Sequence, residues 1–361
     1  MHAAGTDPSE PAARHIIRPP GLHRLSSRPE SWADSEGNTV VDAAVTDRLR
    51  LLRIPPAWTH VWASPDPTSP IQATGVDSRG RTQYRYSAEA AVAASQDKFD
   101  HLLQFAASLP HLRQQVNADL GAVPLASTEE LEPRRVTAAV IRLLDRGLFR
   151  VGNERYARDN HTYGLTTLRR NQVSVAGDTA TFDFIGKEHI GHHLVVTDSG
   201  AAAVVTELLE QEADPEIPVF ATADPPLWRR IDSVTVNSYI HSHGAVTASA
   251  KTFRTWGATV VAAAVVAGAA FHDVATTRRS PDLVPYDAAA HLLGDTRAVA
   301  RRSYVHPQAV QAGRSEKVAV AVGIATSESD SDDVRDIFHD HRVQAAVLDF
   351  LISNARAGES S

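Results

Sequence analysis

The 361-residue sequence contains no cysteine, which excludes disulfide bonds, thiolate metal ligands and a cysteine nucleophile. No apolar run reaches the roughly 18 residues that a membrane span requires. The longest candidate, Ala258–Phe271, is mostly alanine and valine and is typical of a buried helix. The first twenty residues lack the apolar stretch of a signal peptide, so they do not predict export. These absences favour a soluble, cytoplasmic protein with no membrane partner.

The common nucleotide-binding and hydrolytic motifs are missing as well. The Gly-Lys pair ending at Lys187 is followed by Glu188 instead of Ser or Thr, so it does not form a phosphate-binding loop. The patterns GxGxxG, HExxH and GxSxG do not occur. The histidines in His192-His193 and His241-Ser-His243 are weak metal candidates, and surface or core histidines explain them more simply. We therefore expect no metal ion, no nucleotide and no other cofactor.

Lysine is scarce, and the acidic residues are unevenly placed. Lysine occurs only at Lys98, Lys187, Lys251 and Lys317, so chemistry that arginine cannot perform is worth seeking at these positions. The net charge of −7 by itself argues against a nucleic-acid partner. Residues 326–361 alone contribute −5 of it, however, so the rest of the chain is nearly neutral and can carry a local basic groove.

The patterning predicts an α+β fold, with a small β-rich N-terminal domain and a larger, mainly helical C-terminal domain. Residues 1–20 are rich in Pro, Ala and Ser and are predicted to be disordered. Short strands and turns are predicted over residues 21–90, including a β-hairpin around the turn at residues 77–80. Helical periodicity dominates residues 91–361, apart from a three-stranded β element over residues 172–197. After about Ala201 only helices are predicted, and the acidic segment 326–361 comes last.

A sparse set of cations and one tyrosine could carry chemistry. Arg150 opens the run RVGNERY, Lys187 lies at a predicted hairpin turn, and Arg254 follows the start of a helical stretch. Tyr304 lies in the run SYVHP. Each of these residues alone has a simple structural explanation, such as an ion pair or a solvated turn.

Taken in order and context, these residues resemble the type IB DNA topoisomerases, in the short bacterial and poxvirus-like form. The resemblance runs from about Gly21 to beyond Pro307. The segments that carry it are IPPAW (54–58), QATGVDSRGRTQYRY (72–86), RLLDRGLFRVGNERYARDNHTYGLTTLR (142–169), FIGKE (184–188), FRTWG (253–257) and SYVHP (303–307).

Carried over by motif, the catalytic positions of the family fall on Tyr304 as nucleophile, Lys187 as general acid, and Arg150 and Arg254. A fifth position, His in the poxvirus enzymes and usually Asn in bacterial ones, is Asp295 here. This is a departure, because His or Asn can donate a hydrogen bond to a phosphate oxygen, whereas an ionised carboxylate can only accept one. We expect Asp295 to be protonated in the DNA complex, to turn away, or to weaken catalysis.

The chemistry of these residue types supports those roles. A tyrosine hydroxyl with a pKa near 10 is only ~0.1% ionised at pH 7, about 4 kcal/mol from its reactive form, so it needs a cationic pocket. Arg150 and Arg254 could supply that pocket and offset charge in the transition state. Arginine is a poor proton donor, but a lysine beside other cations can protonate the departing 5′-oxygen, which makes Lys187 the sensible general acid.

The predicted hairpin is the main candidate for DNA contacts. Strand alternation puts Arg81, Gln83 and Arg85 on one face. The other face carries Thr82, Tyr84 and Tyr86, and such a β-ribbon can enter the major groove. By resemblance, Gln83, Tyr84 and Tyr86 match DNA-contacting positions of the poxvirus enzyme, while an exposed hairpin with solvated arginines is the alternative. The full set of DNA-contact candidates is Gln72, Arg79, Arg81, Gln83, Tyr84, Arg85, Tyr86, Tyr163, Arg169 and Lys251.

The resemblance implies a monomer of the bacterial nucleoid that clamps double-stranded DNA between its two domains. It would relax positive and negative supercoils through a 3′-phosphotyrosyl intermediate, strand swivelling and religation, without ATP or metal. A tyrosine recombinase is the closest alternative. Such enzymes have the pattern HxxR at the second arginine, however, whereas this chain has Lys251-x-x-Arg254, the topoisomerase form. A DNA-binding relative with little catalysis is a further alternative, because of Asp295.

Overall fold

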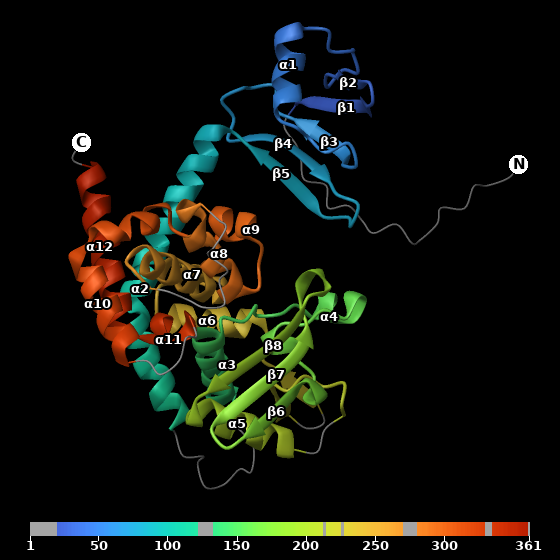
Figure 1. The fold of residues 1–361 in the computed structure, drawn as a ribbon. Helices are drawn as coiled ribbons and strands as arrows, with labels where there is room; N and C mark the ends of the chain where they lie inside the picture. Colours follow the sequence, from blue (N-terminus) through green and yellow to red (C-terminus); the bar gives the residue numbers. More distant parts are fainter. Residues whose placement is uncertain are drawn as a thin grey trace, which may run out of the picture. The chain divides into compact units, whose positions relative to one another are not determined.

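The computed structural model describes residues 20–121, 133–211, 214–224, 227–269, 280–328 and 334–359. Its contacts divide the chain into two compact units, one ending at Lys98 and the other beginning at Phe99. Figure 1 colours both by sequence, from blue through green to red. The predicted disorder of residues 1–20 falls, except for residue 20, outside the described residues. The predicted domain bounds, 21–90 and 91–361, stay a prediction.

The N-terminal unit is built on a five-stranded antiparallel sheet with the strand order β2-β1-β3-β4-β5. Its strands are β1 (Leu22–Ser27), β2 (Glu30–Ala33), β3 (Thr59–Ala63), β4 (Ile71–Val76) and β5 (Thr82–Tyr86). The predicted hairpin is confirmed, since β4 pairs with β5 and sets Thr74 opposite Tyr84. One helix, α1 (Ala43–Leu51), was not predicted. It starts at the Asp42 carboxylate, which accepts two backbone N–H groups, and it buries Leu49 in the core of this unit.

The C-terminal unit is mainly helical, as predicted. Helix α2 (Ala88–Leu120) crosses the division between the two units. The α-helices that follow it are α3 (Pro133–Gly147), α4 (Glu154–Asn160), α5 (Ser199–Glu210), α6 (Ser233–His243), α7 (Ala250–Val266), α8 (Val284–Leu293), α9 (Arg297–Ser303), α10 (Glu316–Glu328), α11 (Val334–His339) and α12 (His341–Glu359). Short 3₁₀ helices are η1 (Leu165–Thr167), η2 (Arg170–Gln172), η3 (Lys187–His189), η4 (Pro281–Leu283) and η5 (Pro307–Arg314). None of the helices within the described residues is long and apolar enough to cross a membrane.

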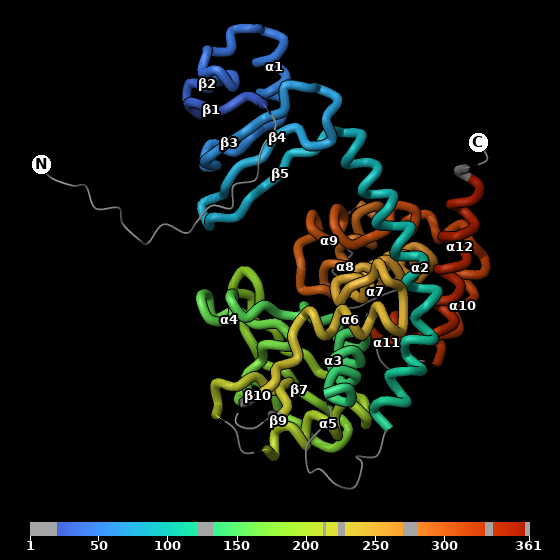
Figure 2. The backbone as a smooth tube through the Cα atoms, turned by 180° about the vertical axis from the view of Figure 1, so that it is seen from behind, coloured from blue at the N-terminus to red at the C-terminus, as the bar shows by residue number. Residues whose placement is uncertain are grey.

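Helix α7 forms the centre of this unit. It contacts α3, α6, α8, α11, α12 and η5, and Figures 1 and 2 show it enclosed by them. Every residue from Ala258 to Ala264 is buried, because small side chains let the neighbouring helices approach closely. One close approach is at Gly257, where an added Cβ would lie 2.7 Å from Leu148 Cδ1. The predicted buried helix is therefore present up to Val266, while residues 270 and 271 lie outside the described residues.

The predicted three-stranded element is confirmed as the antiparallel sheet β6-β7-β8. Its strands are β6 (Val173–Ala176), β7 (Thr179–Ile185) and β8 (Gly191–Thr197), and helices α3 and α5 pack against it. The prediction of helices alone after Ala201 is wrong. A two-stranded ribbon, β9 (Ala221–Asp224) and β10 (Leu227–Arg230), follows α5, and its strands are too short to show alternation in the sequence.

The described part of the acidic segment is folded. Helix α12 packs against α7 and α10, and Figures 1 and 2 both show α10 and α12 side by side. Arg342 donates to Glu328 and to Asp340, each at 2.5 Å, and Lys317 pairs with Asp349. These ion pairs neutralise part of the negative charge of the segment.

Candidate active site

Two arginines from distant parts of the chain meet at one carboxylate in the C-terminal unit. Arg150 follows the end of α3, where Leu148, at a φ of +51°, turns the chain out of the helix. Arg254 lies one turn into α7. Arg150 Nη2 donates to Asp295 Oδ1 at 2.8 Å, and Arg254 Nη2 donates to Asp295 Oδ2 at 2.7 Å. The carboxylate therefore bridges both of the predicted catalytic arginines.

The backbone around Asp295 holds it in this bridging position. Helix α8 ends at Gly294, whose φ of +58° is a left-handed conformation that glycine adopts without steric cost. The amide of Asp295 donates back to Ala290 O at 2.9 Å, and the Thr296 side chain caps the next helix, α9. The side chain of Asp295 is only 12% exposed. One of the three expectations for Asp295 was that its side chain turns away from the site. In this structure the side chain faces both arginines and has not turned away.

Arg254 has more N–H donors than there are hydrogen-bond acceptors around it among the described residues. Its side chain is 5% exposed, and it also donates to Leu148 O at 2.5 Å and to Leu293 O at 2.9 Å. Its Nε is buried and has no hydrogen-bond partner within the described residues. Burial, and then the neighbouring Arg150, lower the pKa of Arg254. Because a buried N–H without an acceptor is costly, the site is suited to receive a further acceptor, such as an anion.

Tyr304 lies beside Arg254. It directly follows α9, and its side chain is buried. The guanidinium of Arg254 lies 5.3 Å from the centre of its ring, and the Lys251 ammonium lies 5.5 Å away. Thr259 of α7 donates to Tyr304 O at 3.3 Å and accepts from His306 N at 3.1 Å, which fixes the backbone on both sides of the tyrosine. Two cations are thus held against the phenol.

Lys187 does not join this cluster. It lies in η3, at the tip of the hairpin between β7 and β8, and its side chain is 68% exposed. Its ammonium lies 3.8 Å from the Glu188 carboxylate. The hairpin tip is tight, since Glu188 and His189 both have positive φ values, of 65° and 60°. The structure therefore brings together four of the five predicted catalytic residues and leaves the fifth at an exposed turn.

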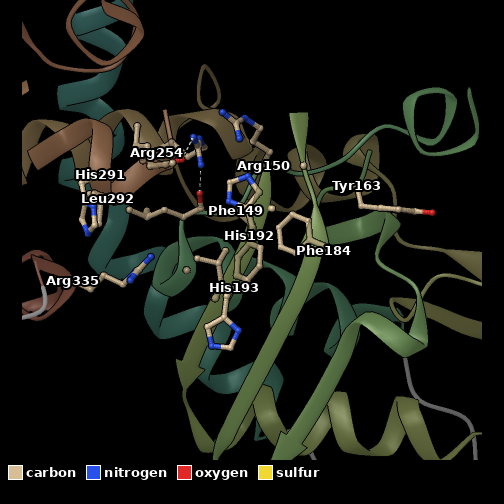
Figure 3. Close-up of a pocket in the computed structure, with 17 residues that line it drawn as sticks. Phe149, Arg150, Tyr163, Phe184, His192, His193, Arg254, His291, Leu292 and Arg335 are labelled. Carbon is tan, nitrogen blue, oxygen red and sulfur yellow. Dashed lines mark hydrogen bonds between the residues drawn. The ribbon is translucent and has the colours of Figure 1, made fainter. Parts of the chain in front are cut away.

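The two arginines of the cluster, Arg150 and Arg254, line a pocket of about 290 Å³. Figure 3 shows Arg150, Arg254 and His192 together on one wall, and Arg335 and His291 at another part of the pocket. Burial, and then the two arginines, lower the pKa of His192. The sequence indicated His192 only as a weak metal candidate and gave no sign of Arg335, which comes from the acidic segment.

Comparison with known proteins decides the family. Residues 87–326 match the family described as "Eukaryotic DNA topoisomerase I, catalytic core". Residues 31–77 match the family described as "Bacterial DNA topoisomerase IB, N-terminal domain". The chain belongs to the type IB DNA topoisomerases. The catalytic-core match contains both arginines, Lys187, Asp295 and Tyr304, whereas Arg335 lies beyond its end.

Two viral relatives illustrate the extent of the likeness. The DNA topoisomerase 1B of Acanthamoeba polyphaga mimivirus is 32% identical over 225 residues, which cover 62% of this chain and 65% of that protein. The DNA topoisomerase 1B of vaccinia virus (strain Copenhagen) is 26% identical over 144 residues, or 39% of this chain and 43% of that protein. This chain therefore covers less than two thirds of the length of either relative.

In this topoisomerase chain, the predicted DNA-contacting strand β5 has one exposed and one engaged face. Tyr84 and Tyr86 are 41% and 55% exposed, and their rings stack 6.0 Å apart. On the other face, Arg81 Nε and Gln83 Nε2 both donate to Asp77 Oδ2, at 2.8 Å and 2.9 Å. Arg85 also lies on this face and donates to a backbone carbonyl. The predicted alternation is confirmed, and it leaves the tyrosines as the accessible side of the strand.

Gln72 has a structural position instead of the predicted place at the DNA. It is 4% exposed, and its Nε2 donates to the carbonyls of Asp66, Pro67 and Ser69. Its Oε1 accepts from Arg48 Nη1 at 2.6 Å. Because the protein itself uses the whole amide, Gln72 holds the loop between β3 and β4 and is withdrawn as a DNA contact.

The remaining DNA-contact candidates are dispersed. Arg79 is exposed at the tip of the β4–β5 hairpin. Tyr163 lines the pocket, but Figure 3 shows it directed away from Arg254. Arg169 lies 3.7 Å from Glu216, and Lys251 lies over the ring of the predicted nucleophile, as described above. Lys251 is thus the candidate that lies beside the predicted nucleophile.

Proposed function

We propose that this chain is an active type IB DNA topoisomerase, which relaxes positive and negative supercoils without ATP or metal. Tyr304 Oη loses its proton to solvent and attacks a phosphorus atom of one strand, the bond from phosphorus to the 5′-oxygen breaks, and a 3′-phosphotyrosyl link forms. The free end swivels around the intact strand and releases helical tension of either sign. The 5′-hydroxyl then attacks the phosphotyrosine and restores the strand, so the bond energy is conserved and no cofactor is consumed.

The observation that carries this proposal is that Arg150 and Arg254 meet at Asp295 while Tyr304 packs beside Arg254. Arg254 Nε is buried and has no hydrogen-bond partner among the described residues, and Arg150 uses one of its five donors in a side-chain bond to Asp295. A phosphate at this point would accept from both guanidinium groups, whose fork geometry suits its oxygens. The same groups would offset the charge that develops on the transition state.

Lys187 is the proton donor in this proposal. The departing 5′-oxygen needs a proton, and an ammonium can lose one where a guanidinium cannot. The lysine lies at an exposed hairpin tip, so bound DNA has access to it. When the ammonium protonates the 5′-oxygen it becomes neutral, and it recovers a proton when the hydroxyl attacks during religation.

Double-stranded DNA is the proposed partner, bound by a single copy of the chain in the bacterial nucleoid. The exposed pair Tyr84 and Tyr86 supports a contact by the N-terminal unit, because aromatic rings on an edge strand can lie against groove edges and sugars. Arg79, at the tip of the same hairpin, is the proposed phosphate contact there.

A second candidate function is a DNA-binding relative with little cleavage activity. The bridging carboxylate of Asp295 favours it, because the phosphate would have to share both arginines with a negative charge. The experiment that separates the two is relaxation of positively and negatively supercoiled plasmid in EDTA without ATP, comparing the wild type with Tyr304→Phe.

Relaxation by the wild type alone, together with a covalent DNA adduct, would support the topoisomerase. DNA binding without relaxation would favour the second candidate. Equal relaxation by Tyr304→Phe, or loss of activity in EDTA, would overturn the proposed mechanism. Joint molecules formed from two duplexes would point instead to a tyrosine recombinase.

A further inference from the structure

His192 is a half-buried imidazole that the mechanism above does not use. It lies on β8, in the wall of the pocket that also contains Arg150 and Arg254. Figure 3 shows its ring beside the two arginines. Neither ring nitrogen hydrogen-bonds to any residue that the structure describes, although the neighbouring His193 is paired with Asp183 at 2.6 Å. A polar ring in this position has an unused donor at the point where the phosphate is proposed to bind.

The surroundings hold the ring of His192 in one place. Its face stacks on Phe184, with the ring centres 5.1 Å apart and the planes 22° from parallel. One edge lies against Gly186, where an added Cβ would come within 2.5 Å of the ring. The other edge lies against Gly294, where a Cβ would be 2.8 Å from Cε1. Both glycines are needed for this close approach, so the backbone next to Asp295 is shaped around the histidine.

Asp295 cannot supply a donor from its own position. Its two carboxylate oxygens accept from Arg150 and Arg254, and an ionised carboxylate has no proton to give. We propose that His192 is a further phosphate-binding residue, whose ring N–H donates to a non-bridging oxygen of the scissile phosphate beside the two arginines. The proposal rests on the topoisomerase function put forward above.

The electrostatic setting suits a neutral donor. Arg150, Arg254 and Asp295 are the charged groups that act on His192, and burial together with the arginines lowers its pKa. At neutral pH the imidazole then carries one N–H and no charge. A neutral donor can bind the phosphate without adding repulsion to two guanidinium groups that are already close together.

The test is single-turnover cleavage of a duplex by the full chain, using a substrate whose cut end cannot religate. His192→Ala is expected to cleave about 10- to 100-fold more slowly than the wild type, with duplex affinity unchanged. His192→Asn keeps an N–H donor and should recover part of the rate. His193→Ala is the matched control, because His193 is the adjacent residue and pairs with Asp183 instead, and it should cleave at the wild-type rate.

Two further comparisons separate phosphate binding from a structural role. Asp295→Asn introduces an amide donor, so it should accelerate His192→Ala by a larger factor than it accelerates the wild type. A methylphosphonate substrate replaces one non-bridging oxygen by a methyl group. With the isomer that lacks the oxygen bound by His192, the wild type and His192→Ala should cleave equally.

Wild-type cleavage by His192→Ala would overturn the inference while leaving the topoisomerase function intact. The same conclusion follows if the loss of rate persists on both methylphosphonate isomers, since a structural defect does not depend on which oxygen is present. If the wild type itself forms no covalent adduct, the proposed function fails, and this inference fails with it. Thermal unfolding of each variant shows whether it is folded, and His192→Asn, which retains a polar side chain, serves as the test if His192→Ala does not fold.

Discussion

Replacing Asp295 by Asn is expected to make the protein cleave DNA faster and unfold more easily. The carboxylate accepts from both of the proposed catalytic arginines, at 2.8 Å and 2.7 Å, so it neutralises part of the positive charge that a bound phosphate would need. Asparagine is nearly the same size, keeps one acceptor oxygen and adds an N–H donor. The substitution therefore changes the charge of the site with little change of shape.

The magnitude follows from the shared arginines. A carboxylate and a phosphate bound to the same two guanidinium groups lie roughly 5 Å apart, which at an effective dielectric constant of about 20 gives a repulsion of about 3 kcal/mol. Solvent and the partial retreat of the carboxylate reduce this value, and each 1.4 kcal/mol that remains is about tenfold in rate. We expect single-turnover cleavage to rise about 10- to 100-fold.

Stability should change in the opposite direction. Removing one partner from a buried ion pair costs about 3–5 kcal/mol, and asparagine retains an acceptor for one of the arginines. The free energy of unfolding of Asp295→Asn, measured by chemical denaturation, should therefore fall by about 2 kcal/mol. Faster cleavage with lower stability is the signature of a carboxylate that stabilises the free protein and hinders the reaction.

Asp287→Asn is the matched control. Asp287 lies on α8 and receives a hydrogen bond from Arg297 at 2.5 Å, and its side chain is 8% exposed, so it is a buried carboxylate whose arginine partner is not one of the predicted catalytic residues. This variant should lose stability without cleaving faster. A cleavage rate for Asp295→Asn that is unchanged or lower than wild type would refute the reasoning, because the carboxylate would then not be a handicap.

Three further predictions concern the proton donor, the DNA surface and pH. Lys187→Ala should slow cleavage by about 10²–10⁴-fold. The loss should be much smaller on a substrate with sulfur in place of the 5′-oxygen, because the sulfur leaves without needing a proton. Equal losses of rate on both substrates would exclude general-acid catalysis by Lys187. Replacing both Tyr84 and Tyr86 by Ala should weaken duplex binding about tenfold in a titration while cleavage at saturating DNA stays constant; unchanged affinity would remove the strand from the DNA surface. Burial lowers the pKa of His339 from 6.5 to about 4 in the folded protein. Because the unfolded chain therefore binds a proton at His339 at a higher pH than the folded protein does, stability falls as the pH drops from about 6.5 to 4. In His339→Gln, the free energy of unfolding measured by chemical denaturation should fall by about 2 to 3 kcal/mol less over this pH range than in the wild type. If the free energy of unfolding changes with pH equally in the two proteins, His339 is not the group responsible.

Much of the fold was predictable because its signals are local. The helical spacing of apolar residues located α2 and α3, and the turn at residues 77–80 located the β4–β5 hairpin. Helix α1 was missed although Asp42 is a recognisable cap, because nine residues carry little periodic signal. The ribbon of β9 and β10 was missed for the same reason, since each strand has only four residues.

By itself, the sequence determined the family and indicated the candidate reactive groups. Arg150, Lys187, Arg254 and Tyr304 stand in runs of residues specific enough to name their chemistry, and such runs do not depend on folding. Strand alternation also predicted the two faces of β5, because side chains along a strand alternate wherever the strand lies.

Only the tertiary structure decided what surrounds those groups. Asp295 could have turned away from the site, but the glycine cap of α8 and the burial of Arg254 place it between two arginines 145 and 41 residues distant in the chain. Gln72 was a candidate DNA contact by its residue type and place in the sequence, yet its amide hydrogen-bonds to a loop of its own unit. His192 carried no signal beyond its residue type, because its neighbours in the pocket come from three other parts of the chain. Such contacts depend on packing between distant segments, which no local pattern records.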